Sequence, residues 1–94
     1  MDSFGKNTRI IRIQEMEQIF TAAKNAFDEG IFRPEEDAEQ GEMLRILTEY
    51  YESPLWKDDY AADERGELPG NLLRGVLSED GLYNLLTDIA EESV

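Results

Sequence analysis

The stretch from Leu68 to Leu86 constrains the fold most, because it combines a turn, a glycine stop and the start of an amphipathic helix. Its proline–glycine pair is typical of a turn, and we expect residues 71–74 to form one helical turn before Gly75, which suits a left-handed stop. Ser78 is a preferred N-cap residue. The apolar residues that follow have the spacing of one helix face: Leu82, Leu85, Leu86 and Ile89. We therefore predict a C-terminal helix that packs against the rest of the chain.

The N-terminal third predicts one long helix. Apolar residues between Ile10 and Phe27 alternate spacings of three and four, which indicates a helix from an N-cap at Thr8 (or Asn7) to about Asp28. Arg9 and Arg12 fall away from this apolar stripe. Residues 1–7 are expected to form a mobile arm.

Two proline signals predict the next helices. Pro34 suits the first position of a second helix, although residues 34–42 are so acidic that they fit a solvated turn or a loop equally well. Residues 43–51 carry two apolar stripes and should be buried. Ser53 and Pro54 predict a short third helix over residues 54–64. Its side chains are expected to face inward at Leu55, Trp56 and Tyr60, and outward at Lys57, Asp58, Asp59 and Asp63.

Together these segments predict an all-α fold, a small compact bundle of about four helices. Two helices are longer, the third is short and the fourth is C-terminal, with an irregular connection containing proline and glycine before it. Residues 8–92 should form a single helical domain. No segment alternates with period two in the way a strand would. The 94 residues are enough for one small core.

Charge is distributed unevenly along the chain. Residues 1–33 hold five acids and five bases, whereas residues 34–94 hold seventeen acids and four bases, which accounts for the whole net charge of −13. Such a field repels phosphate and anionic lipid, so we expect neither direct nucleic-acid binding nor membrane binding, and we expect a protein partner with a basic surface. The chain has no cysteine and no apolar run near the roughly 20 residues of a membrane span, so a cytoplasmic location is expected.

Most catalytic arrangements are missing from the sequence. Histidine and cysteine are both absent, which removes Ser–His and Cys–His pairs and the usual zinc ligands, and no glycine-rich phosphate loop is present. We predict no enzymatic activity and no cofactor. Asp59 and Asp63 lie four residues apart and are weak candidates for a Mg²⁺ or Ca²⁺ site, although acids on one helix face are more often solvated.

Arg74 is the most informative single residue. It is the only base after Arg65, and apolar residues flank it. We predict that its guanidinium pairs with Asp59, Asp63 or Glu64 of the third helix and holds residues 68–77 against that helix. Recognition of an anionic group on a partner is the alternative role.

Aromatic and acidic residues of the third and fourth segments are the candidate interaction surface. Trp56 and Tyr51 are expected in the core, and Tyr60 and Tyr83 at the surface. The full set of interaction candidates is Arg74, Tyr60, Tyr83, Asp58, Asp59, Asp63 and Glu64. The leading hypothesis is a non-enzymatic protein–protein interaction module, either monomer or homodimer. The alternatives are a nucleic-acid mimic that inhibits a DNA- or RNA-binding enzyme, and a Mg²⁺- or Ca²⁺-binding carboxylate module.

Three blocks of the sequence resemble a known family. They are residues 12–17 (RIQEME), residues 50–53 (YYES) with Trp56 and Asp59, and residues 62–64 (ADE) with Leu68-Pro69 and 74–80 (RGVLSED). In these blocks the chain resembles a bacterial domain-of-unknown-function family, the one numbered four-two-nine-eight, over about two thirds of its length. The resemblance implies a small, all-helical cytoplasmic bacterial protein and supplies no activity and no catalytic residues.

Overall fold

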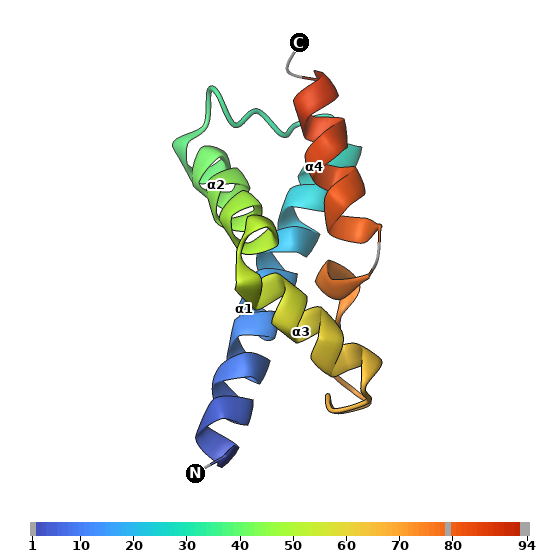
Figure 1. Cartoon of the computed structure of the whole chain (residues 1–94). Helices are drawn as coiled ribbons and strands as arrows, with labels where there is room; N and C mark the ends of the chain where they lie inside the picture. The colour runs from blue at the N-terminus through green and yellow to red at the C-terminus, as the bar shows by residue number, and fades with distance from the viewer. Residues whose placement is uncertain (1, 79, 93–94) are drawn as a thin grey trace.

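A computed structural model describes the backbone of residues 2–78 and 80–92 and the side chains of residues 8–78 and 80–92. Within them the chain forms four α-helices and one 3-10 turn, and no strand (Figure 1). The elements are α1 (Asp2–Asp28), α2 (Ala38–Glu52), α3 (Pro54–Glu64), η1 (Gly75–Leu77) and α4 (Gly81–Glu92). The predicted all-α bundle with an irregular connection before its last helix is confirmed. No helix in the described ranges is both long enough and apolar enough to cross a membrane.

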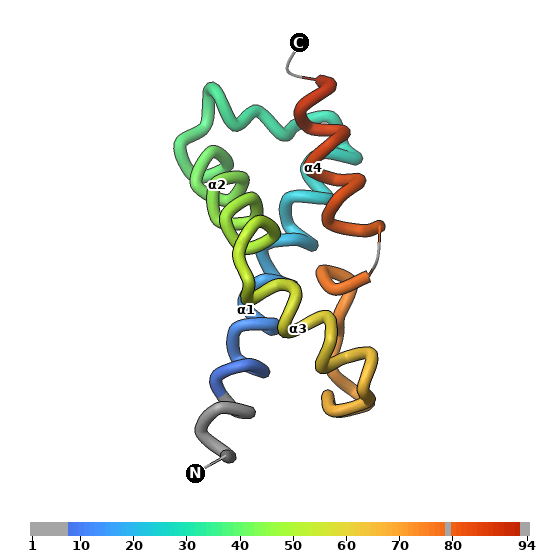
Figure 2. The backbone as a smooth tube through the Cα atoms, viewed as in Figure 1, coloured from blue at the N-terminus to red at the C-terminus, as the bar shows by residue number. Residues whose placement is uncertain are grey.

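Helices α1, α2 and α4 pack against one another, and α3 and η1 lie at the end of this group where α2 finishes and α4 begins (Figures 1 and 2). The two shorter helices of the group are antiparallel: α2 runs toward α3, and α4 runs in the opposite direction toward the C-terminus (Figure 1). The C-terminal end of α2 therefore lies beside the N-terminal end of α4.

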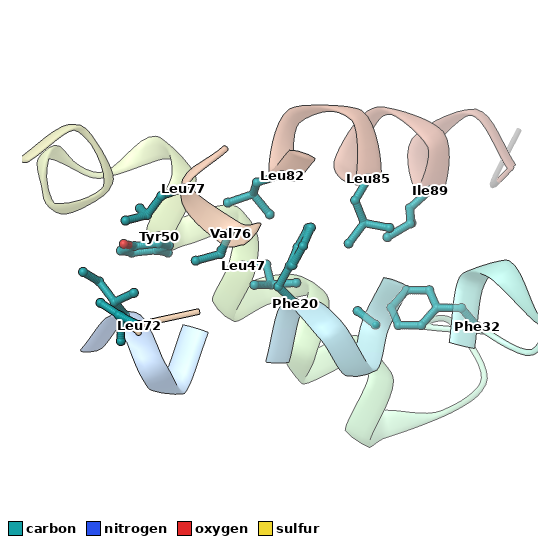
Figure 3. Close-up of a cluster of buried hydrophobic side chains, with 12 residues drawn as sticks. Phe20, Phe32, Leu47, Tyr50, Leu72, Val76, Leu77, Leu82, Leu85 and Ile89 are labelled. Atoms are coloured by element: carbon teal, nitrogen blue, oxygen red, sulfur yellow. The ribbon is translucent and has the colours of Figure 1, made fainter. Parts of the chain in front are cut away.

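The core lies where these elements meet. On α4 the side chains of Leu82, Leu85 and Ile89 are buried, as predicted, and point toward Phe20 and Phe32 (Figure 3). The other core residues come from α1, α2, η1 and the connection before η1: Ile13, Ala23, Leu47, Tyr50, Leu72, Val76 and Leu77. Burial of the amphipathic face of α4 therefore fixes its position, because packing supplies most of the stability of a short helix.

The start of α4 depends on a close approach between Ser78 and Gly81. The Ser78 hydroxyl accepts a hydrogen bond from the Gly81 amide over 3.0 Å, which confirms the predicted cap. A Cβ on Gly81 would lie 2.2 Å from that hydroxyl and 2.9 Å from the Gly75 carbonyl oxygen. Only glycine fits there without displacing the neighbouring chain.

The connection before α4 differs from the prediction. Residues 72–74 are not helical, and the 3-10 turn begins at Gly75 itself, which does not adopt a left-handed conformation; Gly30 and Gly66 do, at φ 77° and 72°. The reason is tertiary. A Cβ on Gly75 would lie 3.2 Å from a carboxylate oxygen of Glu17, so this glycine permits close packing on α1.

One helix start is corrected, and the other is decided between the two predictions that the sequence left open. The helical backbone of α1 begins at Asp2, six residues before the expected cap at Thr8. In α2, Pro34 lies in a turn and the helix begins at Ala38, with the Asp37 carboxylate accepting from the Gln40 amide over 3.1 Å. The Gln40 side chain also binds the backbone at Ile31 and Arg33, which holds the 31–37 connection against the start of α2.

Candidate functional site

Four aromatic rings form a row across three helices. Tyr83 of α4 lies 6.4 Å from Tyr51 of α2 between ring centroids, and Tyr51 lies 4.9 Å from Trp56 of α3. Trp56 stacks on Tyr60 at 5.2 Å and donates its indole N–H to the Val76 carbonyl over 3.1 Å, which fixes the middle of the row. Tyr83 is 53% exposed, as predicted, whereas Tyr60 is only partly exposed.

A groove of about 680 Å³ opens between α2 and α4, with Tyr51 and Tyr83 at one end. Both walls have helical spacing. The α2 wall consists of Leu44, Thr48, Tyr51 and Glu52, and the α4 wall of Tyr83, Leu86, Thr87, Ile89, Ala90 and Glu91. Because most of these side chains are apolar or aromatic and most are not fully buried, this α2–α4 groove is a hydrophobic surface open to solvent.

Acidic residues lie at the two ends of the α2–α4 groove. Glu52 is the last residue of α2 and Glu91 is the second-last of α4, and the two helices are antiparallel, so the carboxylates mark opposite ends. Neither helix has a basic residue in its last turn. Carboxylates near helix C-termini face the negative end of the macrodipole, an arrangement that a bound cation would relieve.

A separate charged site is buried where α1, α2 and α3 meet. The Asp59 carboxylate, 0% exposed, accepts from the Arg12 Nε over 2.9 Å, the Arg12 Nη2 over 2.6 Å and the Arg9 Nε over 3.2 Å. The Tyr50 hydroxyl donates a fourth hydrogen bond over 2.6 Å. Every buried polar side-chain atom in the described residues has a partner, so this network is fully satisfied.

The network shifts the ionisation of its members. Burial, and then the hydrogen bond to Asp59, raise the pKa of Tyr50 far above its usual 10.0. The hydrogen bond to Asp59 also raises the pKa of the Arg12 guanidinium above its usual value. Tyr50 therefore stays a neutral hydrogen-bond donor, and Arg12 stays charged.

Asp59 corrects the sequence prediction most clearly, since it was expected to face solvent as an interaction and metal candidate. The buried face of α3 carries Asp59 and Ala62, while Leu55 is 44% exposed instead of facing inward. Both oxygens of Asp59 already accept hydrogen bonds from cationic donors. Among the described residues, no group of three or more acids is placed to hold a metal ion.

Arg74 forms the contact predicted for it, with Asp63 as the partner. The same guanidinium donates to three carbonyls of its own connection, those of Leu72 over 3.3 Å, Pro69 over 3.0 Å and Gly70 over 3.4 Å. Arg74 therefore fixes residues 69–74 against α3. Of the remaining interaction candidates, Asp58 and Glu64 are exposed on α3.

Glu17 is a residue that sequence reasoning missed. Its carboxylate accepts from the Val76 amide over 2.8 Å, while Trp56 binds the carbonyl of the same residue. Side chains from α1 and α3 thus satisfy both backbone groups of Val76. The sequence did hold a signal for Glu17. It lies between Met16 and Phe20 of the apolar face of α1, so its carboxylate is at the edge of the face that packs on the rest of the chain.

Comparison with known proteins identifies a family that the chain matches. The family described as "Domain of unknown function (DUF4298)" matches residues 13–93 of the chain. Searches of curated proteins and of solved structures each found no match. The matched region contains α2, α3, α4 and all of the groove residues named above.

Proposed function

The chain belongs to the DUF4298 family, a family of unknown function, and we propose that it is a non-enzymatic, cytoplasmic protein-interaction module. Its docking surface is the α2–α4 groove, and its partner is a protein with a basic surface. The observation that carries this proposal is an open apolar groove with a carboxylate at each end, Glu52 and Glu91. Apolar and aromatic anchors supply affinity, and the surrounding charge selects the partner.

Electrostatics support a cationic partner. Helix α2 carries four acids and one base, Arg45, and that base is ion-paired with Glu42 and Glu49. Helix α4 carries three acids and no base. A positively charged partner would be steered to this face, whereas phosphate-rich ligands would be repelled.

The side chains that could have supported chemistry are committed to the fold. The chain has no histidine and no cysteine, Asp59 is held by two arginines, and Asp63 is paired with Arg74. This arrangement favours binding over catalysis. The metal-binding alternative is weakened for the same reason, because both of its candidate carboxylates, Asp59 and Asp63, are paired with arginines.

A nucleic-acid mimic is the second candidate, favoured by the net charge of −13. A mimic needs exposed carboxylates spaced like phosphates, and it has no use for an apolar groove lined by Tyr51 and Tyr83. The groove therefore favours the interaction module. Competition with DNA distinguishes the two functions. DNA should displace a partner that is bound by a nucleic-acid mimic, and it should leave a partner bound in the α2–α4 groove in place.

Site-specific photo-cross-linking tests the proposal. A photoreactive phenylalanine analogue replaces Tyr83 in the groove, and in a control protein it replaces Asn25, an exposed residue of α1 that does not line the groove. Each protein is incubated with lysate of its native host and irradiated, with and without excess DNA. We expect a discrete protein adduct from position 83 alone, unaffected by DNA. Equal labelling from position 25, or an adduct that DNA abolishes, would contradict the proposal.

A further inference from the structure

We infer that the occupant of the α2–α4 groove is a single amphipathic α-helix of a basic partner protein, with apolar residues on one face and a lysine or arginine near each end of that face. This inference rests on the proposed function and specifies its partner. Three observations support it: the helical spacing of both walls, the internal hydrogen bonding of the backbone behind them, and the position of the two carboxylates.

The shape of the groove suits a helix. Its α2 wall runs from Leu44 to Glu52 and its α4 wall from Tyr83 to Glu91, nine residues each, which is roughly 12 Å of helix or a little over two turns. Two antiparallel helices lying side by side leave a trough between their side-chain ridges. A third helix fills such a trough by packing its own ridges into it.

An extended peptide suits this groove poorly. The backbone groups of α2 and α4 are used within the helices, and the described residues contain no strand edge that could pair with a peptide. An extended segment would place its own N–H and C=O groups against Leu44, Leu86 and Ala90 without partners, and this costs free energy for each group. A helix satisfies those groups internally.

The two carboxylates define the charge pattern of the partner. Glu52 and Glu91 lie at opposite ends of the groove, and neither is ion-paired within the described residues. Bases spaced about eight to eleven residues apart on one helix face would reach both, with apolar residues on the same face between them. Acids at both ends also disfavour an anionic lipid as the occupant.

The chain's own α1 is the alternative helical occupant, supplied by a second copy. Its bases Arg9 and Arg12 are already bound to Asp59 of the same chain, so they are not free to reach Glu52 or Glu91 of another copy. A partner of different sequence therefore fits better.

Synthetic peptides of about 18 residues, long enough to form an isolated helix, test the inference by calorimetry and circular dichroism. The first peptide carries a leucine stripe with a lysine at each end of the same face. The second has the same composition with the stripe dispersed, the third has a central proline, and the fourth has glutamates in place of the lysines. We expect the first to bind with a micromolar Kd and to gain helicity, and the other three to bind at least tenfold more weakly.

Charge-matched variants locate the site. The double variant Glu52→Lys, Glu91→Lys should weaken binding of the first peptide at least tenfold, whereas Asp58→Lys, Glu64→Lys changes net charge equally on exposed positions of α3 and should weaken it less than threefold. Equal losses from both pairs would mean that only overall charge matters, and would overturn the inference.

Other outcomes separate this inference from the proposed function. If the proline peptide binds as well as the first one while position 83 still cross-links to a partner, the helix is wrong and the docking surface stands. If neither peptide binding nor cross-linking is found, both fail. Sedimentation that shows self-association lost in Tyr83→Ala would assign the groove to a second copy and overturn the basic-partner helix.

Discussion

Replacing Asp59 with alanine tests the most unusual structural feature of this protein, a fully buried carboxylate that joins three helices. The substitution removes the acceptor of two hydrogen bonds from Arg12, one from Arg9 and one from Tyr50. Two guanidinium groups and a phenol then lie partly desolvated without their anion. The loss should therefore be much larger than that of a surface ion pair.

The magnitude follows from burial. Removing one partner of a buried ion pair costs about 3–5 kcal/mol. The side chains of Arg9 and Arg12 are 28% and 20% exposed, so water can partly rehydrate them, and we take the lower end, about 3 kcal/mol. A chain of this length has a free energy of unfolding of roughly 5–14 kcal/mol, so the variant should fold and melt about 12–24 °C lower.

Urea unfolding followed by fluorescence of Trp56, the only tryptophan, gives the measurement. Asp58→Ala is the matched control, because Asp58 is the adjacent residue of α3 and is exposed. It should change the free energy of unfolding by less than about 0.5 kcal/mol. Arg12→Ala should cost little more in the Asp59→Ala background, giving a coupling of about 2 kcal/mol. If Asp59→Ala unfolds at the same urea concentration as Asp58→Ala, the reasoning about the buried network is wrong.

Three further predictions concern other contacts. Arg74→Ala should lower the free energy of unfolding by about 1–2 kcal/mol, because its carboxylate and carbonyl contacts are lost. Arg65→Ala, at an exposed ion pair, should have a clearly smaller effect, and equal effects of the two substitutions in urea unfolding would contradict this. Gly81→Ala should destabilise by about 1–3 kcal/mol because its Cβ would meet the Gly75 carbonyl at 2.9 Å, and a gain in melting temperature would refute that contact. Folding raises the pKa of Tyr50, so its contribution to the free energy of unfolding is complete below about pH 10 and is lost as pH rises beyond that, because the unfolded phenol then ionises first. Tyr50→Phe should therefore lose melting temperature less steeply than the parent chain as pH rises above about 10, and identical slopes would exclude this linkage.

Local sequence signals predicted the elements that local physics determines. The start of α3 at Pro54 follows from a serine–proline pair, and its end at Glu64 follows from Arg65 and Gly66 directly after it. The buried face of α4 follows from apolar spacing. These features need only neighbouring residues, so a single sequence carries them. The contact of Arg74 with α3 was also predictable, because a lone base among apolar residues requires an acid and α3 supplies several.

The errors arose where a distant contact decides the conformation. Trp56 and Asp59 lie three residues apart on one face of α3, so Asp59 could have been assigned to the buried face with Trp56. It was assigned to solvent because the sequence of α3 does not show which cationic residues pair with it. Those partners, Arg9 and Arg12, are about fifty positions away. The pair itself was a usable signal, because two arginines three residues apart lie on one helix face and can share one carboxylate. Gly75 was misassigned for the same reason, since its close approach to Glu17 cannot be seen locally.

Most of the described bases are used internally, and this determines what the surface can bind. Six of them form ion pairs with acids of the same chain: Arg9, Arg12, Lys24, Arg45, Arg65 and Arg74. Each such pair removes a positive charge that could have attracted an acidic partner or compensated Glu52 and Glu91 at the ends of the groove. The fold therefore concentrates the acidic excess of the sequence at the surface. A partner gains electrostatic affinity at the α2–α4 groove only by supplying its own cations. Because apolar walls separate Glu52 from Glu91, those cations must lie on either side of a hydrophobic face of the partner.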